Sequence, residues 1–100
     1  MKKIIDGRLY NTDTARCIGE RSCYAPGDYH HFSESLYQKT TGEFFLHGEG
    51  GPLSPYAVTE GSTSSSGRAI VPLSLTEAED WISNYLGAEV YISLFGEPAE

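Results

Sequence analysis

One segment near the C-terminus, SLTEAEDWISNYLG at residues 74–87, limits the possible folds more than any other part of the chain. Ser74, with Glu77 three residues later, matches the capping box that begins many helices, and Gly87 is a typical helix stop. We therefore expect one main helix at about 75–86, and its apolar face needs a separate layer to cover it. The apolar residues of this segment follow the spacing of a helix with one buried face: Leu75, Ala78, Trp81, Ile82, Tyr85 and Leu86.

The residues before this helix supply the covering layer, because several segments alternate with the period of a strand. The strongest pattern is the pair SESLYQKT and EFFLHG, which flank Thr41-Gly42 with the spacing of a β-hairpin. Asp6-Gly7 predicts a second hairpin, between residues 3–5 and 8–10. Residues 14–23 and 68–73 also have strand character. Within EFFLHG, either Phe44 and Leu46 or Phe45 and His47 face the core.

Two segments have no decisive pattern. Residues 48–67 are rich in Gly and Ser, and we expect one long loop there. Residues 88–95 fit either a strand, with Val90, Ile92 and Leu94 alternating, or one face of a helix.

The chain is therefore expected to be α+β: an antiparallel sheet of four to five strands packed by the helix at about 75–86. One hundred residues suit a single domain, residues 1–100. No run approaches the ~18 apolar residues of a membrane span, and MKKIIDGRLY lacks the apolar core of a signal peptide. We expect a cytoplasmic protein, in which Cys17 and Cys23 are free thiols.

The stretch HGEGG at residues 47–51 invites two chemical interpretations. His47 and Glu49 could form an acid–base pair, but no nucleophile stands at a fixed spacing from them. A phosphate loop would need a helix directly after the glycines and usually a lysine, and neither is present. We expect a glycine turn, with no catalytic residue.

A metal site is not expected either. Two cysteines and three histidines carry the atoms that bind zinc, but their spacing does not match a compact zinc module. We therefore expect no metal and no cofactor.

Charge is divided unevenly along the chain. Residues 1–39 hold six basic and five acidic side chains, a net +1, whereas residues 40–100 hold one basic and nine acidic side chains, a net −8. An acidic surface repels the phosphates of nucleic acids and attracts basic proteins. Direct binding of nucleic acid is therefore disfavoured. A cluster with Tyr24, Tyr29 and His30 in one predicted loop offers a second contact surface.

Four stretches resemble a family of small acidic, mostly uncharacterised proteins from mobile elements and phages of Firmicutes. They are MKKIIDGRLYNTDTA, ESLYQKTTGEFFLHGEGGPLSPYA, IVPLSLTEAEDW and LFGE. The resemblance implies a short C-terminal helix at residues 88–95. It also implies an anti-CRISPR or antirestriction role in the bacterial host cell, without catalytic residues.

The expected function is a non-enzymatic inhibitor that binds a host defence nuclease, most simply a CRISPR effector. Nucleases hold nucleic acid in positively charged channels, which carboxylates on a folded protein can occupy. Two alternatives remain: a structural or regulatory interaction module that binds another basic protein or itself as a homodimer, and a small metal protein or enzyme using His47, Glu49 and the cysteines. The expected partner-binding residues are Glu43, Glu49, Glu77, Glu79, Asp80 and Glu89, with Tyr24, Tyr29 and His30.

Overall fold

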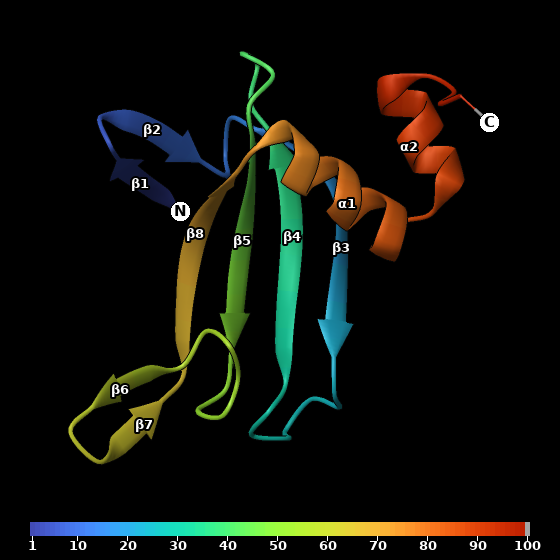
Figure 1. The fold of residues 1–100 in the computed structure, drawn as a ribbon. Coiled ribbons are helices and arrows are strands. Elements are labelled where there is room, and N and C mark those ends of the chain that lie inside the picture. The colour runs from blue at the N-terminus through green and yellow to red at the C-terminus, as the bar shows by residue number, and fades with distance from the viewer. Residues whose placement is uncertain (100) are drawn as a thin grey trace.

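A computed structural model describes residues 1–99 and has the predicted α+β architecture (Figure 1). Its elements, in chain order, are β1 (Lys2–Ile5), β2 (Arg8–Asn11), β3 (Arg16–Cys23), β4 (Phe32–Gln38), β5 (Phe44–Gly50), β6 (Val58–Glu60), β7 (Thr63–Ser65), β8 (Gly67–Leu73), α1 (Leu75–Tyr85) and α2 (Ala88–Phe95). Four strands form one antiparallel sheet in the order β3-β4-β5-β8. The hairpins β1–β2 and β6–β7 form separate two-stranded sheets.

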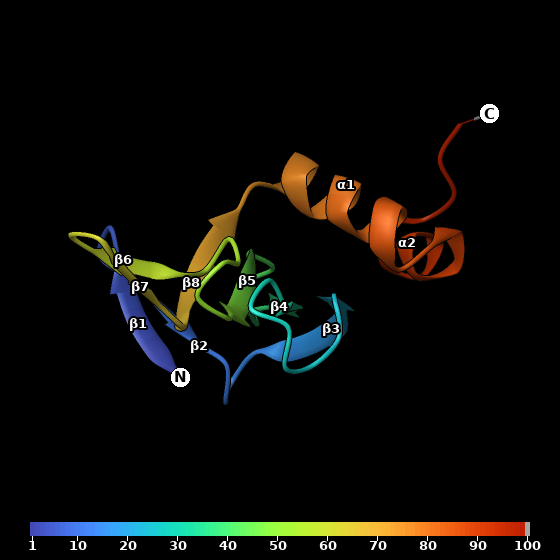
Figure 2. The same ribbon diagram turned by 90° about the horizontal axis from the view of Figure 1, so that it is seen from below.

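The four-stranded sheet is covered on both faces, because the central strand β5 is apolar on both. Phe44 and Leu46 face the helices, whereas Phe45 faces the β1–β2 hairpin, so both alternatives from the sequence contribute to the core. Figure 2 shows the helices on one side of the sheet and β1–β2 on the other. The helix-side core contains Leu36, Phe44, Leu46, Ala78, Trp81 and Ile82, and the hairpin-side core contains Tyr10, Phe45 and Ile70.

The main helix begins where the sequence predicts. The Ser74 side chain accepts a hydrogen bond from the Glu77 N–H at 3.1 Å, and the Glu77 carboxylate accepts one from the Ser74 N–H at 2.9 Å. The buried face is shorter than expected: Leu75 and Tyr85, at the two ends of α1, are 59% and 48% exposed.

Residues 88–95 form a helix, as the resemblance implies. Gly87 separates α2 from α1 and has a φ of 95°, a conformation that glycine adopts without strain. The half-buried side chains Val90, Tyr91, Leu94 and Phe95 pack against the helix-side core.

The β1–β2 hairpin turns at Asp6-Gly7, as predicted. Both residues have positive φ, 50° and 75°, which is the requirement of a two-residue type I′ turn. The hairpin lies outside the main sheet and packs onto it through Tyr10, whose ring meets Phe45 edge-on at 5.4 Å.

The expectation of one long loop at residues 48–67 is wrong. Strand β5 continues to Gly50, because Gly48 and Gly50 pair with β4 on one side and β8 on the other. The expected glycine turn is therefore extended strand, and Gly48, Gly50 and Gly51 are not among the positive-φ residues. The polar segment after it forms the β6–β7 hairpin, and only residues 51–57 connect it to β5.

Candidate protein-binding surface

The outer side of the helical layer contains a groove between α1 and α2. It has a volume of about 410 Å³ and combines carboxylates with apolar side chains. The sharp turn at Gly87 places α2 back against α1, and the Tyr91 hydroxyl joins the helices by donating to Glu79 at 2.8 Å. This bond to the carboxylate raises the pKa of Tyr91. The groove is lined by Thr76, Glu79, Asp80, Ser83, Ala88, Tyr91, Ile92 and Pro98.

The groove lies in a part of the chain with charge of one sign only. Residues 69–99 include no Lys, Arg or His, and their acidic side chains have no basic neighbour within that segment. Asp80 and Glu89 are exposed, and Glu79 is half-buried beside Tyr91. The segment contains Glu77, Glu79, Asp80, Glu89 and Glu97.

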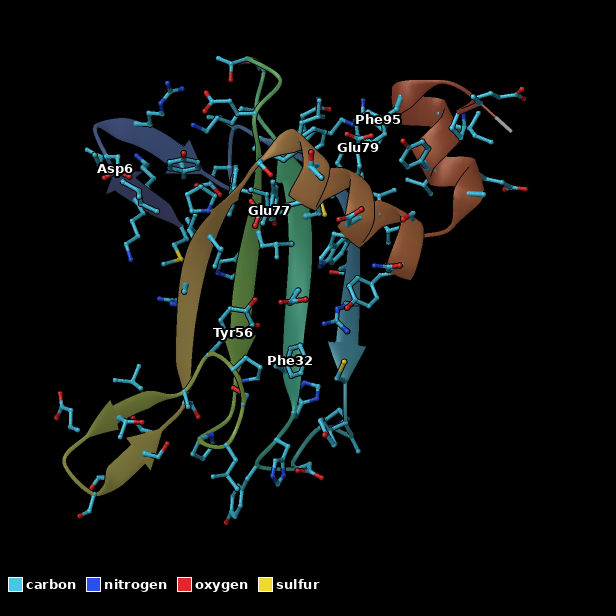
Figure 3. The ribbon with its side chains drawn as sticks, viewed as in Figure 1. Asp6, Phe32, Tyr56, Glu77, Glu79 and Phe95 are labelled. Carbon is cyan, nitrogen blue, oxygen red and sulfur yellow. The ribbon has the colours of Figure 1, made fainter. Side chains whose placement is uncertain are left out.

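Glu77 belongs to this layer but is tied to the start of α1. Hydrogen bonds from the Ser74 backbone N–H and then its side chain lower the pKa of the Glu77 carboxyl. It adds negative charge to the layer (Figure 3), and one of its carboxylate oxygens accepts the hydrogen bond from the Ser74 N–H that caps the helix. Glu77 is therefore a poor position for testing partner binding.

Glu43 lies elsewhere and is already neutralised. It sits at the β4–β5 turn, where Arg8 contacts it at 3.0 Å and Lys39 at 3.7 Å. Partial desolvation raises the pKa of Glu43, but Thr41, Lys39 and Arg8 together lower it more. This residue stabilises the junction between the hairpin and the sheet.

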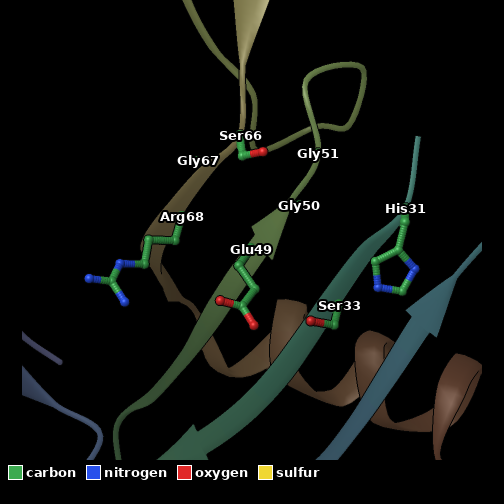
Figure 4. A pocket seen from close by; sticks show the side chains of 8 residues that line it. All are labelled: His31, Ser33, Glu49, Gly50, Gly51, Ser66, Gly67 and Arg68. Carbon is green, nitrogen blue, oxygen red and sulfur yellow. The ribbon is translucent and has the colours of Figure 1, made fainter. Parts of the chain in front are cut away.

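Glu49 lies on the face of the sheet opposite the helices. It pairs in register with Arg68 of β8, and both side chains line a shallow hollow near the end of β5 (Figure 4). His47 lies on the same face two residues earlier, and its buried Nε2 has no hydrogen-bond partner among the described residues. Burial lowers the pKa of His47, and the charge of Glu49 opposes that shift only in part.

Tyr24, Tyr29 and His30 occupy the loop between β3 and β4, at the end of the sheet away from α2 (Figure 1). Tyr24 and Tyr29 are 63% and 68% exposed. The rings of Tyr24 and His30 lie 5.5 Å apart, and Asp28 fixes the His30 ring through a 3.0 Å contact. The nine predicted partner-binding residues therefore divide among four places, and the four acidic residues of α1 and α2 are the largest group that lies together.

The sequence did not reveal the most connected polar group of the molecule. Glu34, in β4, accepts hydrogen bonds from Arg21 at 2.9 Å, from the Trp81 indole at 3.3 Å, and from the Tyr56 hydroxyl. Together Arg21, Glu34, Tyr56 and Trp81 form what we call the Glu34 cluster. Its signal in the sequence was Trp81, an indole on a buried helix face that needs a hydrogen-bond acceptor.

The Glu34 cluster is compact and largely closed. Desolvation raises the pKa of Glu34, but the hydrogen bonds from Tyr56, Arg21 and Trp81 outweigh it and lower the pKa overall. The Arg21 guanidinium also stacks over the Tyr85 ring at 3.8 Å. The cluster joins β3, β4, α1 and the 51–57 segment, so its geometry suits positioning of the helical layer.

Within residues 1–99, no helix is long and apolar enough to cross a membrane. No three His, Cys, Asp or Glu side chains in that range are grouped to hold a metal ion. Comparisons with protein-family models, curated proteins and solved structures gave no significant match.

Proposed function

We propose that this protein is a non-enzymatic inhibitor that binds a basic surface of a host defence nuclease through the groove between α1 and α2. The observation that carries the proposal is the composition of this groove. It places Asp80 and Glu79 beside the apolar side chains of Tyr91 and Ile92, in a segment without basic residues. Such a surface attracts cations and also excludes water from the contact.

The chemistry of the partner follows from the groove. A nucleic-acid channel is lined by Lys and Arg, so carboxylates held at fixed positions can bind there in place of phosphates. The resemblance to mobile-element proteins makes a CRISPR effector the first candidate, with restriction nucleases second. Binding of this kind weakens with salt, because exposed charges are screened over about 8 Å at physiological ionic strength.

The test uses purified protein with a panel of CRISPR effectors and restriction nucleases, and it measures nucleic-acid binding and cleavage. We expect the wild type to reduce nucleic-acid binding by one effector, and the variant Asp80→Lys with Glu89→Lys to lose most of that effect. The matched control is Glu60→Lys, an exposed charge reversal on the β6–β7 hairpin. It should inhibit like the wild type.

Two results would contradict the proposal: no inhibition of any nuclease in the panel, or equal inhibition by the folded groove variant. Circular dichroism and thermal unfolding establish that each variant is folded.

A second function is favoured by the exposed tyrosines at the other end of the sheet. Tyr24, Tyr29 and the nearby Leu53, which is 55% exposed, offer a contact surface separate from the groove. Two separate surfaces suit a regulatory interaction module of a mobile element that joins two proteins. Such a module would bind its partners without changing nuclease activity.

A further inference from the structure

The β1–β2 hairpin presents an apolar pair to solvent. Ile4 and Leu9 are directly opposite each other in the register and are 72% and 55% exposed. Strand alternation places them on the outer face of the hairpin, because Ile5 and Tyr10 face the sheet. Lys2 lies on the same outer face, one pleat away from Ile4.

This end of the molecule is basic. The segment from Met1 to Asn11 holds three basic side chains and one acidic side chain, Asp6. Arg8 is paired with Glu43, but Lys2 and Lys3 have no acidic partner within residues 1–99. The hairpin therefore combines an exposed apolar pair with unpaired positive charge.

The groove between α1 and α2 has the complementary composition. Its apolar part includes Ile92, which is 39% exposed, and its charged rim includes Asp80, with Glu89 nearby on α2. The hairpin and α2 lie far apart, on opposite sides of the sheet (Figures 1 and 2). The hairpin consequently cannot reach the groove of its own chain.

We propose that the protein associates head to tail, with the β1–β2 hairpin of one copy occupying the α1–α2 groove of the next. Ile4 and Leu9 would bury their exposed surface against Tyr91 and Ile92. Lys2, on the same outer face as Ile4, would face the acidic rim of the groove. The two surfaces of this contact differ, so it is heterologous and leaves one free hairpin and one free groove at the ends of each assembly.

The contact has two further properties. It is small, since each strand of the hairpin has only four residues, and small interfaces are weak and reversible. It also covers the groove. A basic partner would therefore compete with self-association for the groove. As the partner binds free monomers, the assembled form would dissociate and supply more of them.

The test is analytical ultracentrifugation of the full chain as a function of concentration and salt. We expect the mean mass to rise above the 11.0 kDa of the monomer with increasing concentration at about 50 mM NaCl. At about 500 mM NaCl it should return to the monomer value. A wild type that stays monomeric at low salt would overturn the proposal.

Two variants identify the surfaces. Lys2→Gln with Ile4→Thr removes the positive charge of the outer face and the most exposed apolar side chain of the hairpin. Asp80→Lys with Glu89→Lys reverses one carboxylate that lines the groove and one that follows the lining residue Ala88. Each variant alone should be monomeric. Their equimolar mixture should form a 1:1 dimer and nothing larger, because each copy keeps one intact surface.

Persistence of assembly in either single variant would refute the head-to-tail contact, as would a mixture that remains monomeric. Assembly lost only in the hairpin variant would indicate contact between two hairpins. The nuclease test separates this inference from the proposed function, because the hairpin variant keeps its groove and should still inhibit.

Discussion

At the scale of single residues, Gly48 and Gly50 make room for the segment that follows them. A Cβ atom at Gly48 would lie 1.9 Å from Cζ of Tyr56, and one at Gly50 would lie 2.3 Å from Oγ of Ser54. Both glycines face the helix side of the sheet, where residues 51–57 fold back over β5. The glycines of HGEGG therefore allow Tyr56 to reach Glu34, and Glu49 between them points to the other face.

The first prediction concerns this close approach. Gly48→Ala should lower the free energy of unfolding by about 1–3 kcal/mol, the usual cost of inserting a methyl group into a filled space. Chemical denaturation measures the change. Glu49→Ala, at the next residue but exposed, is the control and should stay within about 0.5 kcal/mol of the wild type. Equal losses in the two variants would show that Tyr56 does not pack on Gly48.

The second prediction concerns Glu34, whose side chain is 12% exposed. Glu34→Gln should lower the free energy of unfolding at neutral pH by about 2 kcal/mol, because Arg21, Tyr56 and Trp81 lose a charged acceptor. The pKa of Glu34 in the folded state is lowered from 4.5. Its stabilisation is therefore complete above that value and is lost as the pH falls through the folded-state pKa.

Urea denaturation from pH 7 to pH 3 gives the measurement for Glu34→Gln. The difference between wild type and variant should be largest at neutral pH and should shrink below about pH 4.5. Glu60→Gln, on the exposed β6–β7 hairpin, is the matched control. A difference that does not change with pH would mean that the carboxylate charge of Glu34 contributes nothing.

At the scale of elements, local signals explain which parts could be predicted. The β4–β5 hairpin and α1 could be predicted from short sequence motifs, a turn dipeptide for the hairpin and a capping box for the helix. Residues 88–95 contain no such motif, and their apolar residues fit both the spacing of a strand and that of a helix. The helical conformation is favoured by packing, because a helix places four side chains against the core at once: Val90, Tyr91, Leu94 and Phe95.

The β6–β7 hairpin could not be predicted for a related reason. Its strands hold one apolar residue, Val58, and all their residues are exposed, so there is no apolar alternation from which a strand could be predicted. Its position depends on contacts made at its base, where Gly67 approaches the backbone oxygen of Tyr56. Such contacts between distant residues leave no local pattern in a sequence.

The third prediction belongs to α1. Ser74→Ala should lower the free energy of unfolding by about 1 kcal/mol, because the Glu77 N–H at the helix start loses its acceptor. Thermal unfolding measures it. Ser83→Ala, at an exposed position in the last turn of the same helix, should be neutral or slightly stabilising, since alanine favours helix more than serine does. An equally large loss at Ser83 would argue against a specific cap.

At the scale of the whole molecule, the sequence could suggest that an acidic surface exists, but not which acidic residues belong to it and which lie elsewhere. Glu79, Asp80 and Glu89 share one layer because they lie on helices that adjoin in sequence. Glu43 and Glu49 have the same charge in the sequence, but the fold gives them different surroundings. Glu43 contacts two basic residues, Arg8 and Lys39, whereas Glu49 lies on the face of the sheet opposite the helices. Composition records the sign of a charge and not its neighbours.

The basic hairpin and the acidic helical layer lie on opposite sides of the sheet (Figure 2), so positive and negative charge are separated across the molecule. A molecule of this kind experiences a torque in the field of a charged partner and rotates before the two surfaces touch. In front of any positively charged surface, the orientation of lowest energy is the one with the helices toward that surface. The charge separation therefore acts first on the rate of productive encounter, by orienting the protein during its approach.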